Sequence, residues 1–259
     1  MLLAFDVGNT CTVMGVFDKK SLIASWNIST EHNRTGDEYA IMLKNLFHAS
    51  CMNIKDVKSV VISSVVPQTM RHLNEMIKKC FSIEPIVVNS DISDSVGIKI
   101  KIDNPGELGA DRIVNAVAAY SLYGGPVVIV DFGTATTFCV VNGRGEYLGG
   151  AIAPGISISA EALFSKASKL PRVDFKLPLS VIGKNTIHSI QSGVIFGYAA
   201  LVDGMICRIK KEIGECQVVA TGGLSDLIRG VSKEITKYEP LLTLVGLRLI
   251  YDRMCTKDL

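Results

Sequence analysis

The sequence contains one short pattern twice, and this repeat constrains the fold more than any other feature. Residues 2–17 and 127–141 each read as an apolar run, an aspartate, a glycine, a few hydroxyl or amide residues and a second apolar run. At one constant offset the following residues align: Asp6 with Asp131, Gly8 with Gly133, Asn9 with Thr134 and Thr12 with Thr137. Apolar runs on both sides of a polar turn predict a strand, a tight turn and a returning strand. The alternative is two unrelated buried hairpins.

The chemistry of the repeated turn favours a phosphate site. A carboxylate at the end of a strand can reach a cation, and a glycine lets the backbone approach a phosphate closely. Threonine and asparagine groups can donate hydrogen bonds to phosphate oxygens. Two such turns that face each other would hold the phosphate chain of a nucleotide between two related domains.

The rest of the chain predicts that the repeat extends to whole domains. Strands are expected at 2–6, 12–17, 22–28, 57–63 and 85–88 in the first half, with helices near 38–50 and 68–80. The second half repeats this plan, with strands at 127–131, 136–141, 147–153 and 217–221 and helices near 156–167, 189–212 and 224–229. We expect an α/β fold of duplicated ribonuclease-H-like (actin-type) domains, each a mixed five-stranded sheet with flanking helices.

The boundary between the domains is expected near the end of a helix at 111–123, which is followed by two glycines and a proline. This gives an N-terminal domain of residues 1–118 and a C-terminal domain of residues 119–259. A final helix near 241–254 could pack back across the junction.

Composition narrows the class of protein. The 259 residues are 48% hydrophobic and 20% charged, which is typical of a folded chain. The formal charge of +2 is too small to indicate a nucleic-acid surface, so we expect no DNA or RNA partner. The first residues lack a signal-peptide pattern, no apolar stretch is judged long enough to span a bilayer, and no membrane partner is expected.

The seven cysteines are scattered and form no Cys-x-x-Cys pair. Their spacing favours buried thiols in a reducing compartment over disulfides or a zinc site. The expected location is the cytoplasm. The four histidines, His32, His48, His72 and His188, share no metal-ligand spacing.

Two other segments carry candidate chemistry. Neither a P-loop nor a Gly-x-Gly-x-x-Gly motif is present, but Gly222 and Gly223 follow a strand, where backbone could approach a ring or ribose. The alternative is a simple helix entry. Residues 103–112 form a Pro- and Gly-containing loop in which Asp111 is either a helix N-cap or an acceptor for a substrate hydroxyl. Arg112 could hold an anionic group or form a structural salt bridge.

These motifs, taken together, resemble a known family. The residues at 6–10 (DVGNT), 109–112 (GADR), 131–137 (DFGTATT), 149–155 (GGAIAPG) and 221–223 (TGG) are similar to those of type III pantothenate kinases. The match runs in order across essentially the whole chain. The resemblance implies transfer of the ATP γ-phosphoryl group to pantothenate, the first step of coenzyme A biosynthesis, by a cytoplasmic homodimer.

The resemblance also implies roles for individual residues. Asp111 would be the catalytic base toward the pantothenate hydroxyl. Asp6 would act on Mg²⁺ through the phosphates, and Asp131 would ligate a monovalent cation, K⁺ or NH₄⁺. The ATP-binding residues would be Asp6, Val7, Gly8, Asn9, Thr10, Cys11, Thr12, Val13, Thr134, Gly222 and Gly223. The substrate-binding residues would be Gly109, Ala110, Asp111, Arg112 and Thr186.

The sequence departs from the family at one place. The family often has a tyrosine three residues before the proline of the Asn-Pro loop, where this chain has Ile102. Substrate affinity could therefore differ. Two other functions stay open at this stage: a regulatory or binding protein that keeps the fold with little catalysis, and an actin-like kinase of another small hydroxy acid or sugar.

Overall fold

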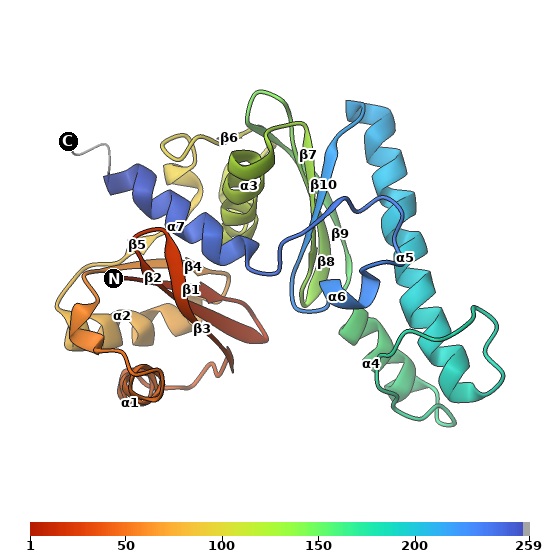
Figure 1. Cartoon of the computed structure of the whole chain (residues 1–259), viewed down its shortest axis with the longest axis horizontal. Helices are drawn as coiled ribbons and strands as arrows, with labels where there is room; N and C mark the ends of the chain where they lie inside the picture. Colours follow the sequence, from red (N-terminus) through yellow and green to blue (C-terminus); the bar gives the residue numbers. More distant parts are fainter. Residues whose placement is uncertain (256–259) are drawn as a thin grey trace. The chain divides into compact units, whose positions relative to one another are not determined.

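The computed structural model describes residues 1–255 as two compact units (Figure 1). The first unit is Met1–Ala118 together with the chain from Leu242 onward, and the second unit is Ala119–Leu241. The division falls inside helix α3 (Ala110–Tyr123). The last helix, α7 (Leu242–Cys255), contacts strands β1, β2 and β4 and so belongs with the N-terminal residues rather than with those that precede it.

The first unit is built on a mixed sheet of five strands in the order β3-β2-β1-β4-β5. These are β1 (Leu2–Val7), β2 (Cys11–Asp18), β3 (Ser21–Ser29), β4 (Ser59–Ser64) and β5 (Ile86–Val87). β1 is antiparallel to β2 and parallel to β4. β1 and β4 are buried on both faces, which explains why they read as continuous apolar runs.

Helices cover both faces of this sheet. α1 (Gly36–Ala49) and α2 (Pro67–Phe81) bury one face of it, with Tyr39, Leu43, Leu73 and Met76 in the shared core. α1 begins at a capping box, in which the Glu38 N–H donates to the Thr35 hydroxyl at 3.3 Å and the Thr35 N–H donates to the Glu38 carboxylate at 2.7 Å. α7 lies against the other face (Figure 1).

Short elements complete the first unit. They are the 3₁₀ turns Ile54–Asp56, Ser90–Ile92 and Pro105–Glu107 and the two-residue strand β6 (Lys99–Ile100). Trp26 of β3 is half-buried, and its ring centroid lies 5.5 Å from that of Phe47 on α1. It therefore belongs to the core of this unit.

The second unit repeats the plan. Its five strands are β7 (Val127–Phe132), β8 (Ala135–Val141), β9 (Glu146–Pro154), β10 (Gln217–Thr221) and β11 (Lys237–Tyr238), and they lie in the order β9-β8-β7-β10-β11. The helices are α4 (Ile156–Lys166), α5 (Thr186–Ile213) and α6 (Ser225–Ile228). α4 and α5 pack on one face of the sheet through Ile156, Ala160, Ile195 and Val202.

The five strands that each unit supplies have the same order and the same pattern of parallel and antiparallel neighbours, which confirms the predicted duplication. The expected count of five strands holds for the first sheet only, because the sheet that contains the strands of the second unit has six. One detail of the sequence alignment is wrong. β1 pairs Val7 with Thr12, whereas β7 pairs Phe132 with Thr136, so the second turn is one residue shorter. The structural counterpart of Thr12 is therefore Thr136 and not Thr137.

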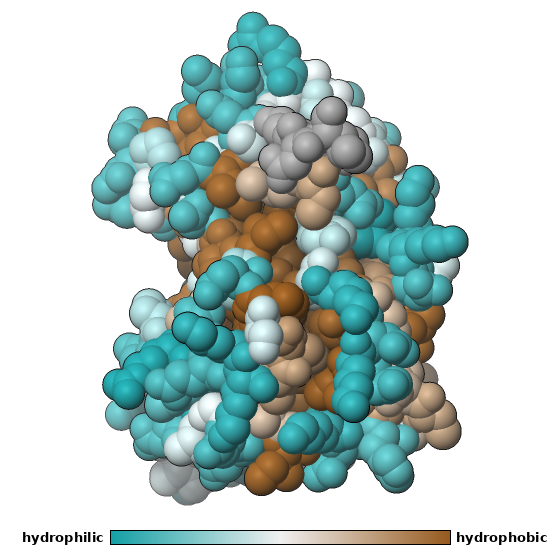
Figure 2. Space-filling model, turned by 90° about the vertical axis from the view of Figure 1, so that its left-hand side faces the viewer, coloured by the Kyte–Doolittle hydropathy of each residue, from teal (hydrophilic) through white to brown (hydrophobic). Residues whose placement is uncertain are grey.

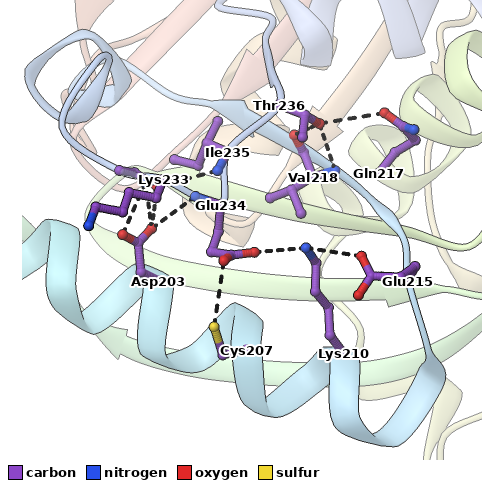
Figure 3. Close-up of polar contacts among 11 residues, drawn as sticks. Asp203, Cys207, Lys210, Glu215, Gln217, Val218, Lys233, Glu234, Ile235 and Thr236 are labelled. Atoms are coloured by element: carbon purple, nitrogen blue, oxygen red, sulfur yellow. Dashed lines mark hydrogen bonds and ion pairs between the residues drawn. The ribbon is translucent and has the colours of Figure 1, made fainter.

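A polar cluster fastens the segment that connects α6 to β11 onto α5 (Figure 3). The carboxylate of Asp203 accepts hydrogen bonds from the Ser232 hydroxyl at 2.5 Å, from the Lys233 N–H at 3.0 Å and from the Glu234 N–H at 3.3 Å. Two turns further along α5, Lys210 pairs with Glu234 at 2.7 Å. The hydrogen bond from this ammonium group to Glu234 raises the pKa of Lys210.

Two sequence-based expectations need correction. α5 is long and apolar enough to cross a membrane by length and composition, although no such stretch was expected. Half of its most apolar window is buried inside the protein, as in the core helix of a folded domain. The thiols are also less buried than expected: Cys139 is buried, but Cys11, Cys51, Cys207 and Cys255 are exposed. They lie in a turn or near helix ends and outer faces, where apolar neighbours in the sequence do not imply burial.

Apolar side chains also reach the surface. Figure 2 shows hydrophilic and apolar residues side by side on one face of the molecule. Exposed large apolar residues occur in both units, and those of the second unit include Ile158, Leu163, Ile187 and Leu201 on α4 and α5. Scattered apolar residues are normal on protein surfaces, whereas groups of them mark interfaces.

Candidate functional site

The first candidate turn connects β1 to β2. Its residues Asn9, Thr10 and Cys11 are exposed, and Gly8 closes the turn with a hydrogen bond from its N–H to the Cys11 carbonyl at 3.0 Å. The Thr30 N–H donates to the Thr10 carbonyl at 2.9 Å, which ties the turn to the end of β3. The strand ends thus present a short, fixed polar loop to solvent, as a phosphate site requires.

The other residues of the segment 6–13 have different surroundings. Asp6 is half-buried at the end of β1, and Val7 is buried in the core. The Thr12 side chain is buried, and its hydroxyl lies 2.8 Å from that of Thr30. Because this hydroxyl already has a partner, we assign Thr12 a structural role at the buried base of the turn. The exposed residues 9–11 form the outer surface of the turn.

Asp111 lies in the first turn of α3, one residue after the helix begins at Ala110. It is therefore not the N-cap, which was one of the two alternatives. The Arg112 N–H donates to the Asp111 carboxylate at 2.8 Å. Burial raises the pKa of Asp111, and the N–H and charge of Arg112 oppose that rise only in part. Desolvation is thus the largest effect on this carboxyl.

The loop before α3 brings Asp111 close to the ends of the strands. A Cβ atom built on Gly109 would lie 2.5 Å from the Asp111 carboxylate and 3.4 Å from the side chain of Val65, directly after β4. The glycine leaves room for this close approach of the carboxylate. Within the first unit, the structure thus brings together the end of β4, Gly109 and Asp111.

The second unit has its own polar turn, with Gly133 and Thr134 exposed between β7 and β8. Asp131 precedes this turn, and Gly222 follows the neighbouring strand β10. Gly222 has a φ of +91°, and a Cβ there would lie 2.5 Å from the Asp131 carboxylate. The hydroxyl and N–H of Ser225 both donate to the Gly222 carbonyl, at 2.8 and 3.1 Å, and so hold the glycine turn in place. Gly223 is exposed beside it.

The surroundings of Asp131 suit a cation. Thr221 pairs with Asp131 across β10 and β7, and Thr137 pairs with it across β8, so oxygen-bearing side chains flank the carboxylate on one face of the sheet. Carboxylate and hydroxyl oxygens are ligands for hard cations. Among residues 1–255, no group of three or more His, Cys, Asp or Glu side chains is placed to hold a metal ion.

Thr186 is the first residue of α5 and is exposed. The helix is capped not by Thr186 but by Asn185, whose side chain accepts a hydrogen bond from the His188 N–H at 2.8 Å. Thr186 lines a pocket of about 400 Å³ between α4 and α5, together with Ser159, Ser189 and Tyr198. Its hydroxyl is therefore available to a ligand.

Sequence reasoning missed one residue of this region. Ser63 at the end of β4 lies beside Asp6 in the parallel pair of β1 and β4. The signal was present, since a hydroxyl residue follows the apolar strand in both halves, Ser63 in the first and Thr221 in the second. Only the strand register shows that each stands next to an aspartate.

A family model described as type III pantothenate kinase matches residues 2–208. A type III pantothenate kinase from Exiguobacterium sibiricum is 49% identical over 253 residues, which cover 98% of this chain and 99% of that protein.

Solved structures with low sequence identity share the fold. A putative Baf family transcriptional activator from Campylobacter jejuni has a TM-score of 0.63 at 19% identity, over 98% of this chain and 99% of that chain. The activator of 2-hydroxyisocaproyl-CoA dehydratase from Clostridium difficile, with bound ADPNP, has a TM-score of 0.54 at 12% identity, over 99% and 97%. At these identities the likeness concerns the fold alone, and it confirms the duplicated actin-type architecture.

Proposed function

The chain belongs to the type III pantothenate kinase family, and from that premise we propose how its residues share the transfer of the ATP γ-phosphoryl group to pantothenate. The reaction is the first step of coenzyme A biosynthesis and uses ATP with a divalent metal ion. Phosphoryl transfer depends mainly on positioning and on neutralising charge. The role assigned to each residue therefore depends on the position of its polar groups.

We assign the phosphates of ATP to the two turns. The exposed backbone and side chains of residues 8–11 would hold one part of the phosphate chain, and Thr134 in the second turn would hold another. Asp6 would act on Mg²⁺ through the phosphates; the ion, when bound, neutralises phosphate charge. Gly222 and Gly223 would let the backbone approach the nucleoside.

Asp111 is assigned as the base. In the transfer, the pantothenate hydroxyl oxygen forms a bond to the γ-phosphorus, the bond from that phosphorus to the β,γ-bridging oxygen breaks, and ADP leaves. The hydroxyl proton passes to the Asp111 carboxylate. Burial raises the pKa of this carboxyl, which makes it a better proton acceptor than an exposed aspartate. Gly109, Ala110, Arg112 and Thr186 would hold the substrate, Arg112 through its charge and Thr186 through its hydroxyl.

Asp131 is assigned to a monovalent cation, K⁺ or NH₄⁺. The support is the oxygen-rich face around it and the absence of a side chain at Gly222, which lets the end of β10 lie close to the carboxylate. The two copies of the repeated turn would then differ in function, because Asp6 would act on the divalent ion and Asp131 would bind the monovalent one.

We also propose that the enzyme works as a homodimer through its second unit. Gly193, Gly197 and Gly204 recur along α5, and a Cβ added at any of them would meet no atom within 4 Å. A second helix could therefore approach this side of α5 closely. Exposed apolar side chains on the same helix, Ile187 and Leu201, give such an interface an apolar component. The free thiols suit the cytoplasm as the place of action.

The observation that carries these assignments is the half-buried Asp111 carboxylate, with its raised pKa, in the first turn of α3 beside the end of β4. The direct test of the activity is to incubate the purified protein with ATP, Mg²⁺, K⁺ and pantothenate and to look for phosphopantothenate. We expect the product to form in proportion to the ADP released. Binding of ATP without any product would instead favour a regulatory protein with little catalysis.

A further inference from the structure

Ser63 is a buried hydroxyl that has no partner. Its side chain is 0% exposed, and its Oγ atom makes no hydrogen bond within residues 1–255. The neighbouring Ser64 differs, because its hydroxyl donates to the Val66 carbonyl at 3.3 Å and accepts from the Val66 N–H at 3.1 Å. An unsatisfied buried hydroxyl costs folding free energy, so Ser63 calls for an explanation.

The strand register places Ser63 beside Asp6. β1 and β4 are parallel, and Asp6 is the partner of Ser63 in the ladder. The preceding pair, Phe5 and Ile62, packs into the core beneath α1 and α2. Because side chains alternate along a strand, Asp6 and Ser63 project from the opposite face. They are therefore neighbours on that face, at the carboxyl ends of two parallel strands.

Asp111 approaches the same strand ends. The side chain of Val65, two residues after Ser63, lies within van der Waals distance of a Cβ built on Gly109, and Gly109 adjoins the Asp111 carboxylate. Asp6, Ser63 and Asp111 thus come from β1, β4 and the start of α3 in one unit. The hydroxyl without a partner lies where the charged groups of the reaction are expected.

We propose that Ser63 is a positioning residue whose hydroxyl finds its hydrogen-bond partner only when Mg²⁺ and ATP bind, by donating to a water molecule that the ion carries beside Asp6. The hydroxyl then fixes the placement of the ion relative to Asp6. This inference rests on the proposed function, since it assigns Mg²⁺ to the Asp6 side of the site. Thr221 stands beside Asp131 in the same way in the second unit, so each aspartate of the repeat has a hydroxyl neighbour on the adjacent strand.

The test compares Ser63→Ala with Tyr39→Phe. Tyr39 also has a buried hydroxyl without a partner, but it lies in the core between α1 and the sheet. Without nucleotide, both variants should unfold at the wild-type temperature or above it, because each loses an unsatisfied hydroxyl. With Mg²⁺ and ATP, Ser63→Ala should show a smaller stabilising shift and a KM for Mg–ATP raised roughly threefold to tenfold, as expected for one lost hydrogen bond. The KM of Ser63→Ala for pantothenate should match that of the wild type. Tyr39→Phe should match the wild type in both its thermal shift with Mg²⁺ and ATP and its KM for Mg–ATP.

Two results would overturn the inference. If Ser63→Ala is less stable than the wild type without nucleotide, the hydroxyl already has a structural role in the free protein. If its response to Mg²⁺ and ATP is unchanged, the hydroxyl has no role in the complex. The thermal shift with Mg²⁺ and ATP needs no turnover, so it tests Ser63 even if the wild type makes no phosphopantothenate. A failure of the proposed function is thereby distinguished from a failure of this inference.

Discussion

Gly222 lies so close to Asp131 that a methyl group on its Cα would come within 2.5 Å of the carboxylate. The same methyl group would lie 2.7 Å from backbone atoms of Phe132, and the φ of Gly222 is +91°. The end of β10 and the end of β7 are thus joined at a point where only glycine fits. If Asp131 holds a monovalent cation, this contact sets the space left for it.

Gly222→Ala should therefore lower both stability and cation activation. We expect a loss of about 1–3 kcal/mol in the free energy of unfolding, from the strained φ and the close contact. Activity at saturating substrate should respond less to K⁺ than that of the wild type. Denaturant unfolding and a K⁺ titration measure the two effects. Gly223→Ala is the matched control for stability, because a Cβ at Gly223 would meet no atom within 4 Å; equal losses in both variants would contradict this account.

The pKa of Asp111 predicts an unusual acid limb in the pH profile. Burial raises this pKa above its ordinary value of 3.8, and the base must be ionised to accept a proton. As the pH falls, kcat/KM should therefore begin to decline at a higher pH than an exposed aspartate would produce. The profile of kcat/KM on the acid side of neutrality measures this. A limb at the ordinary aspartate pKa would show that the folded enzyme does not bury the carboxylate.

The same shift predicts how Asp111 affects stability. A carboxyl whose pKa is raised on folding stabilises the folded state below its unfolded pKa, and this contribution is lost as the pH rises through the folded pKa. At neutral pH the ionised Asp111 therefore opposes folding. Asp111→Asn should unfold at the wild-type temperature or above it at neutral pH, with no gain at low pH. A lower unfolding temperature at neutral pH would assign the carboxylate a structural role.

The polar cluster on α5 should stabilise the segment after α6. Asp203→Ala would leave the N–H groups of Lys233 and Glu234 without their acceptor, at a cost of about 1–3 kcal/mol in the free energy of unfolding. Glu215→Gln is the control, since this side chain is 90% exposed although it lies 3.4 Å from Lys210. Glu215→Gln should change the free energy of unfolding by no more than about 0.5 kcal/mol. Equilibrium denaturation compares the two, and equal effects would argue against an anchoring role for Asp203.

A charge on α5 should weaken the proposed dimer. Leu201→Glu places a carboxylate on the exposed side of α5, where it would be desolvated in an interface, and we expect the dissociation constant to rise by roughly tenfold or more. Ile41→Glu makes the same kind of change on α1 in the first unit, at an even more exposed residue. Sedimentation velocity over a range of concentrations should show dissociation for Leu201→Glu alone. Wild-type behaviour of both variants would move the interface away from α5.

Much of the fold could be predicted because its signals are local. Apolar runs in β1, β4, β7 and β10 and the polar turns between strands are visible in the sequence, and their repetition indicates the duplication. The one-residue difference between the turns was missed. Thr136 and Thr137 are adjacent threonines, so the constant offset still places a threonine opposite Thr12 and hides the shorter turn, and only the ladder identifies Thr136 as the counterpart of Thr12.

The properties that depend on packing could not be predicted. The raised pKa of Asp111 follows from burial between elements that lie far apart in the sequence. The lack of a hydrogen-bond partner for the Ser63 hydroxyl likewise depends on its packing environment. The hydroxyl of the adjacent Ser64 does have a partner, because it accepts a hydrogen bond from the Val66 N–H. Thr186 was expected as a substrate contact from the resemblance alone, and its place in the pocket between α4 and α5 depends on how these helices pack.

The central claim is that Asp111 accepts the proton of the pantothenate hydroxyl, and it is tested most directly by the single-turnover rate of phosphopantothenate formation in Asp111→Asn. With Mg²⁺, ATP and pantothenate all saturating, we predict a rate reduced by roughly a hundredfold or more, as for the loss of a general base. The thermal shift caused by Mg²⁺ and ATP should be that of the wild type. A rate close to that of the wild type would contradict the account and leave Asp111 as a structural residue of α3.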